Sequence, residues 1–158
     1  MTSAGGPLIL VAGSTCTQWG EAPRNYPDDE GDYGRGCEVE GYVGLIDVGT
    51  SEALVLGDMP ARTTFLPEFN VLVREIAGDD EAELPDLVAG LLPKVDWESG
   101  PSWSVTEPVI LFDAVYDSTG IKNEEHLDID LTPGEYAIEA GRIETPGEYL
   151  VLVRLTRI

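Results

Sequence analysis

The stretch LTPGEYAIEAGRIETPGEYLVLVRLTR, residues 131–157, decides what kind of sheet this chain forms. Within it the pentapeptide Thr-Pro-Gly-Glu-Tyr of residues 132–136 recurs at residues 145–149. Proline fixes φ and glycine tolerates positive φ, so each Pro-Gly pair predicts a type II turn. Each turn precedes a strand-forming run, at 136–144 and at 149–157. The stretch therefore predicts an antiparallel meander at the end of the fold.

Strand signals continue towards the N-terminus. Residues 127–131 alternate between apolar residues and aspartate, which predicts one face on the core and Asp128 and Asp130 in water. Residues 6–12 and 109–114 are nearly continuous apolar runs, which predict a buried strand at the start of the fold and a central strand. Other short runs bounded by turn residues predict strands at 42–47, 53–57, 62–66, 70–76 and 103–107. Glycine, threonine and serine at 49–51 predict a hairpin between the first two of these.

The period of the apolar residues changes once, over residues 84–92. Five apolar side chains fall on one helical face there: Leu84, Leu87, Val88, Leu91 and Leu92. Acidic residues precede them and Pro93 follows, so the principal α-helix is predicted to begin near Leu84 and to end before Pro93. The predicted fold class is α+β, mostly antiparallel β, with about eight to ten strands in a sandwich or a strongly bent sheet. We expect a single domain, 1–158, with a long acidic loop that is rich in Gly and Pro at 13–41.

Charge excludes two classes of partner. Nine Lys and Arg stand against 30 Asp and Glu, so the formal net charge is −21. Binding to nucleic acid requires a basic surface, and anionic lipid attracts basic rather than acidic segments. We therefore expect no nucleic acid and no membrane as a partner, whereas a basic protein or a cation is compatible with the charge. Acidity also keeps proteins in solution, so composition alone leaves both explanations open.

The N-terminus predicts a cytoplasmic protein. Residues 1–7 carry no Lys or Arg and the apolar run that follows is short, unlike a secretory signal peptide. No stretch approaches the roughly 20 apolar residues that cross a membrane as a helix. In a reducing compartment, Cys16 and Cys37 are expected to be free thiols.

The long loop has the composition of an interaction surface. Loops of such length are usually functional or disordered, and interfaces combine aromatic anchors with complementary charge. Residues 28–40, called the acidic segment here, hold six carboxylates and one Arg. The predicted partner-binding residues are Trp19, Asp28, Asp29, Glu30, Asp32, Tyr33, Glu38 and Glu40. The alternative is a solvated loop whose aromatic side chains fold back into the core.

No pattern for catalysis, metal binding or a cofactor stands out. Zinc sites need several Cys or His at short spacing, whereas this chain has two Cys and one His. It has no nucleophile elbow, phosphate loop or dinucleotide fingerprint. Asp28, Glu30 and Asp32 match the first three acidic positions of a calcium loop, but Tyr33 and Val39 then stand where Gly and Glu are needed. We therefore predict no catalytic residue, no metal site and no cofactor, and do not expect an enzyme.

Several segments, in order, resemble one known family. They are GGPLILVA at 5–12, Trp19-Gly20, DYGRGCEVEGYVGLIDVGTSEALVLGDMPARTTFLP at 32–67, LVRE at 72–75, VILFDA at 109–114 and LTPGEYAIEA at 131–140. Together they resemble the immunity protein 21 family of bacterial polymorphic toxin systems, most specifically in GGPLIL, ALVLGD and TTFLP. Val11-Ala12-Gly13 departs from the family pattern and leaves the start of the loop unmatched. The resemblance implies a cytoplasmic antidote that binds and blocks a cognate toxin protein, and it supplies no catalytic residues.

Three functions are therefore compatible with the sequence. The first is an immunity protein whose acidic surface occupies the basic cleft of its toxin, for example a nuclease, as a phosphate mimic. The second is a small-ligand or calcium-dependent β-sandwich binding module. The third is an enzyme with dispersed carboxylates, for which no constellation of residues stands out.

Overall fold

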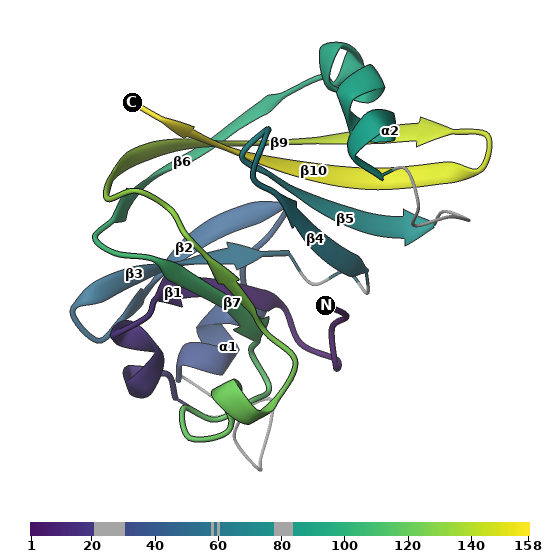
Figure 1. The fold of residues 1–158 in the computed structure, drawn as a ribbon. Coiled ribbons are helices and arrows are strands. Elements are labelled where there is room, and N and C mark those ends of the chain that lie inside the picture. Colours follow the sequence, from purple (N-terminus) through teal and green to yellow (C-terminus); the bar gives the residue numbers. More distant parts are fainter. Residues whose placement is uncertain (21–30, 58, 60, 78–83) are drawn as a thin grey trace.

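The computed structural model describes residues 1–20, 31–57, 59, 61–77 and 84–158. Within these ranges the chain forms two five-stranded sheets, and neighbouring strands in both are antiparallel. Figure 1 shows the sheets stacked on each other, with α2 (Leu84–Leu91) above one sheet and α1 (Asp32–Cys37) below the other. The predicted α+β class, mostly antiparallel with a sandwich arrangement and one principal helix, is confirmed.

The first sheet has the strand order β2-β3-β1-β7-β8. Its strands are β1 (Leu8–Ala12), β2 (Val43–Val48), β3 (Ser51–Leu56), β7 (Val109–Asp113) and β8 (Leu127–Ile129). Every residue of β1 and β7 is buried, because both faces of their sheet are covered. The hairpin predicted at 49–51 is confirmed, since Val48 pairs with Ser51 across a two-residue turn.

The second sheet has the order β4-β5-β10-β9-β6. Its strands are β4 (Arg62–Leu66), β5 (Val71–Ala77), β6 (Glu98–Val105), β9 (Gly134–Thr145) and β10 (Glu148–Arg157). β9 and β10 form the predicted hairpin from the repeated pentapeptide, and β10 pairs with β9 along the whole length of β10. Gly147 in its turn has a φ of 96°, as a type II turn requires.

The first copy of the pentapeptide behaves differently from the prediction. Gly134 has a φ of 156° and already begins β9, so the first Pro-Gly pair makes a bend instead of a type II turn. Tyr136 donates a hydrogen bond from Oη to the carbonyl oxygen of Thr132 at 2.7 Å. That contact closes the bend from the side chain, so the backbone needs no tight turn there.

Edge strand β6 also departs from its predicted bounds. It begins at Glu98, well before residue 103, and ends at Val105. Its pairing with β9 shifts between Ser99 and Ser102, around a Gly-Pro pair. Glycine and proline are signals against a regular strand, but an edge strand accommodates them at a bulge.

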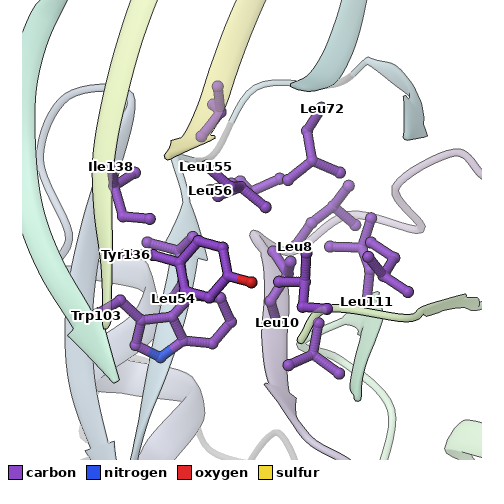
Figure 2. Close-up of a cluster of buried hydrophobic side chains, with 14 of the residues drawn as sticks. Leu8, Leu10, Leu54, Leu56, Leu72, Trp103, Leu111, Tyr136, Ile138 and Leu155 are labelled. Atoms are coloured by element: carbon purple, nitrogen blue, oxygen red, sulfur yellow. The ribbon is translucent and has the colours of Figure 1, made fainter. Parts of the chain in front are cut away.

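Hydrophobic side chains form three layers. One lies between the sheets, and Figure 2 shows members from both, among them Leu8, Leu54, Leu111, Trp103, Tyr136 and Leu155. A second covers the outer face of the first sheet, where Trp19 packs with residues of β1, β3 and β7. The third covers the outer face of the second sheet, where α2 packs on β5 and β10. Because both sheets are covered on both faces, their strands carry the continuous apolar runs seen in the sequence.

Two ionisable side chains lie inside the fold, and each forms hydrogen bonds with a segment that connects strands or precedes β1. Asp113 is fully buried at the end of β7 and accepts a hydrogen bond from Ser3 Oγ at 2.9 Å. Arg74 of β5 is 1% exposed and donates to the carbonyl oxygens of Gly57 and Met59 at 2.6 and 2.7 Å. Since buried charges are stable only when hydrogen-bonded, these contacts hold the N-terminal segment and the crossing from β3 to β4.

Candidate functional site

Part of the predicted loop 13–41 is a short helix. α1 spans Asp32–Cys37 and has buried glycines at Gly34 and Gly36. A Cβ on Gly36 would lie 3.5 Å from Ile9 and 3.9 Å from Trp19, so the helix rests closely on β1 and the indole. Glycine is a poor helix former, and packing on the sheet therefore stabilises this helix more than its own sequence does.

Trp19 lies in the core and not on the surface. It is 2% exposed, and its Nε1 donates to the carbonyl oxygen of Ala114 at 3.2 Å. Its ring meets that of Phe112 edge-on, with 5.5 Å between the centroids. This burial corrects the expectation that Trp19 anchors a partner, because the indole has its apolar surface and its donor engaged inside the fold.

Asp32 and Arg35 tie α1 to its surroundings. Asp32 Oδ2 accepts a hydrogen bond from the backbone nitrogen of Gly20 at 2.8 Å, and its Oδ1 pairs with the Arg35 guanidinium. Arg35 also donates to the carbonyl oxygen of Asp47 at 2.9 Å. The described end of the acidic segment is therefore joined to the β2–β3 hairpin.

The remaining predicted residues fall into two groups. Tyr33 is half-buried and packs against the layer that contains Trp19, whereas Glu38 and Glu40 are exposed. Asp28, Asp29 and Glu30 lie outside the described residues. The structure thus brings Asp32, Tyr33 and Glu38 together at one short helix, and their role in binding stays a prediction.

A pair of carboxylates outside the predicted partner-binding residues lies on the β2–β3 hairpin. Asp47 and Glu52 stand directly opposite each other in the register of the two strands. Both side chains are exposed, and neither has a hydrogen bond or an ion pair with another described residue. Like charges that face each other across a strand pair destabilise it. The signal was available, since a two-residue turn at 49–50 sets this pairing.

These two carboxylates line a pocket of about 330 Å³, called the hairpin pocket here. Trp103, Val105 and Val109 supply its apolar part, and Trp103 is 1% exposed. Its Nε1 lies 3.4 Å from the carbonyl oxygen of Glu52, which fixes the indole beneath the hairpin. The pocket's hydroxyl groups come from Thr50, Ser51, Ser104 and Thr106.

A second pocket of about 390 Å³, the strand-end pocket, shares Val109 with the first. Three carboxylates line it, from Glu107 between β6 and β7 and from Asp128 and Asp130 at β8. The predicted exposure of Asp128 and Asp130 is confirmed. Together the two pockets place five carboxylates at one end of the sandwich.

Glu107 is held in its ionised form. Ser14 donates to its Oε1 from both the hydroxyl and the backbone nitrogen, the latter at 2.9 Å. These bonds lower the pKa of Glu107 below its ordinary value of 4.5. The carboxylate therefore stays negative into more acidic solution than a free glutamate does.

The residues that the structure describes include two cysteines and side chains of the types that could bind a metal ion. Within the described residues neither Cys16 nor Cys37 takes part in a disulfide bond, and burial raises the pKa of the Cys16 thiol. Among the described residues no three His, Cys, Asp or Glu side chains are placed to hold a metal ion. In the same part of the chain no helix combines the length and the apolar character that crossing a bilayer requires.

The chain matches the model of a known protein family. The family model described as immunity protein 21 matches residues 1–149 of the chain. No curated protein and no solved structure matches it.

Proposed function

Because the chain belongs to the immunity protein 21 family, we propose that it neutralises its cognate toxin by covering the toxin with an acidic surface. Family membership implies an immunity protein that acts against a polymorphic toxin. The acidic surface is the finer part of the proposal, and it comprises the hairpin pocket, the strand-end pocket and the exposed end of the acidic segment. In this proposal the protein is a non-enzymatic inhibitor in the cytoplasm.

The observation that carries the proposal is the set of five carboxylates around the two adjoining pockets. They are Asp47, Glu52, Glu107, Asp128 and Asp130. None of them pairs with a Lys or Arg side chain among the described residues. By contrast, Arg62 pairs with Glu75 and Arg154 with Glu139 on the other sheet. The ring Nε2 of His126 lies 3.9 Å from Asp128 Oδ2, whereas the other four carboxylates have no ion pair among the described residues. The hollowed surface therefore keeps most of its negative charge.

A toxin that cleaves nucleic acid suits such a surface best. Its cleft must present basic side chains to hold phosphate groups, and surface carboxylates of an inhibitor can occupy the positions of those phosphates. Opposite charges also speed the encounter of two proteins, by roughly 10- to 1,000-fold at low salt. We therefore propose a nuclease toxin as the partner.

The test is co-expression with the toxin domain encoded beside this chain. We expect growth to be rescued and the two proteins to co-purify. In stopped-flow measurements, raising NaCl from about 0.05 M to about 0.5 M should slow association about 10-fold or more. Dissociation should change much less, because short-range contacts control it.

Two results would contradict different parts of the proposal. Absence of both rescue and co-purification would exclude this toxin as the partner and with it the immunity function. If the complex forms but its association rate does not respond to salt, the immunity function is retained and the proposed role of the acidic surface is wrong.

A further inference from the structure

We propose that the hairpin pocket is the socket for an arginine side chain of the toxin. The inference rests on the proposed function and deepens it, because it names one contact and the chemistry of the group that makes it. Three features of the pocket carry it: the opposed carboxylates at its mouth, the apolar floor and the rigidity of the rim.

The opposed carboxylates define the charge of the group that enters. Asp47 and Glu52 are exact cross-strand neighbours, so their repulsion opposes formation of the hairpin. A cation between them removes that repulsion and gains charge-assisted hydrogen bonds. Binding of a cation is therefore favoured in two ways. It relieves the repulsion between Asp47 and Glu52 in the free protein, and it adds new contacts.

The floor defines the shape and the polarity of the group. Trp103, Val105 and Val109 are all nearly fully buried, and they present apolar surface below the carboxylates. A volume of about 330 Å³ is near the lower limit of small-molecule pockets, which suits a single long side chain. The methylene stem of an arginine packs on such a floor while its head reaches charged groups.

Arginine fits this chemistry better than lysine or a bare cation. Its guanidinium has five donors in a planar fork and is weakly hydrated, which matches two carboxylates and several hydroxyl groups around an apolar floor. A metal ion needs at least three convergent ligands, and the described His, Cys, Asp and Glu side chains form no such group. The pocket therefore suits an organic cation.

The rim is held in place before any partner arrives. The Trp103 indole lies 3.4 Å from the Glu52 carbonyl oxygen on one side of the hairpin. On the other side, Arg35 of α1 donates to the Asp47 carbonyl oxygen at 2.9 Å. A preorganised rim limits the ordering that binding would otherwise require, and it joins the socket to the acidic segment.

The test uses the double variant Asp47→Asn/Glu52→Gln, which removes both charges and keeps the side-chain shapes. Its matched control is Glu144→Gln/Glu148→Gln at the tip of the β9–β10 hairpin, on the opposite side of the molecule (Figure 1). We expect the toxin to bind the first variant about 30-fold more weakly and the control within about threefold. Thermal unfolding should show the first variant to be at least as stable as the original chain, because it loses a repulsion.

A second measurement separates the socket from the proposed function. N-acetyl-arginine methylamide at millimolar concentration should shift the NMR signal of the Trp103 indole N–H, and neutral N-acetyl-norleucine methylamide should not. The shift should vanish in the Asp47→Asn/Glu52→Gln variant and persist in the control.

The outcomes are distinct. If the original chain fails to bind the toxin while the arginine probe binds the pocket, the proposed function is wrong and the pocket's preference for arginine is retained. If the toxin binds both double variants equally, or the probe causes no shift, the socket is wrong.

Discussion

At the scale of single residues, Trp19 shows how one side chain can join several parts of the fold. Its ring contacts Phe112 of β7, its Nε1–H reaches the carbonyl oxygen of Ala114, and Gly36 of α1 lies against it. The residue was a candidate anchor because aromatic residues near carboxylates are typical of interfaces. Its position instead explains how the segment that contains α1 is held on the first sheet.

Substitution of Trp19 should therefore affect stability and not binding. Trp19→Ala removes a buried ring and should lower the free energy of unfolding by about 3–5 kcal/mol. Trp19→Phe keeps a ring but leaves the Ala114 carbonyl oxygen without the indole donor. This substitution should lower the free energy of unfolding by about 1–3 kcal/mol. Urea denaturation measures both values, and the folded Trp19→Phe protein should bind the toxin within about twofold of the original affinity. Normal stability combined with lost binding would show that Trp19 is a surface anchor after all.

At the scale of elements, close packing depends on where glycine stands. Gly141 in β9 lies under the segment that follows α2, and a Cβ there would be 2.4 Å from Val95 Cγ1 and 2.8 Å from the Asp96 carbonyl oxygen. Gly90 in α2 has open space around its Cα. Close contacts therefore require glycine at position 141, whereas no neighbouring atom requires it at position 90.

The two glycines give a matched pair of alanine substitutions with opposite effects. Gly141→Ala should lower the free energy of unfolding by about 1–3 kcal/mol, because the backbone at Asp96 must move. Gly90→Ala should raise it by about 0.5–1 kcal/mol, because alanine favours the helix and meets no neighbour. Denaturant titrations of both variants test the pair. A loss of stability from Gly90→Ala would show that α2 is packed differently from the structure described above.

The elements also show how far the sequence predicts this fold. The period of α2 and the hairpins at 49–50 and 146–147 follow from local patterns, and the structure has them. α1 could not be foreseen, because Asp-Tyr-Gly-Arg-Gly-Cys has little helix propensity and forms a helix only against Ile9 and Trp19. For the candidate site, the acidic segment was visible as composition. The two pockets were not, because each combines residues that are distant in sequence.

At the scale of the whole molecule, repulsion between carboxylates opposes folding. The net charge is −21, and several of the described arginines are already engaged with Glu75, Glu139 and Asp32. Asp47 and Glu52 face each other across the β2–β3 hairpin, and neither side chain has an ion pair with another described residue. A compact state with such a charge is destabilised relative to the expanded chain, and salt screens the difference.

Salt should therefore stabilise the free protein. Raising NaCl from about 0.05 M to about 0.5 M should raise Tm by roughly 2–5 °C, as measured by differential scanning calorimetry. Millimolar CaCl₂ at matched ionic strength should add nothing beyond this screening. An additional rise with calcium would favour the calcium-dependent binding module, and a fall with NaCl would show that attraction between charges dominates the surface.

The pairing of β1 with β7 joins two strands that are synthesised at very different times. Leu8 pairs with Asp113 and Ala12 with Val109, so β1 leaves the ribosome long before its partner exists. Such distant pairing makes folding slow relative to helical proteins and leaves apolar strands uncovered in the meantime. The hairpin pocket needs both Asp47 and Trp103, and the second of these arrives late. On the role proposed above for the hairpin pocket, a truncated chain that lacks Trp103 should give no protection, and the complete protein must be made ahead of the toxin.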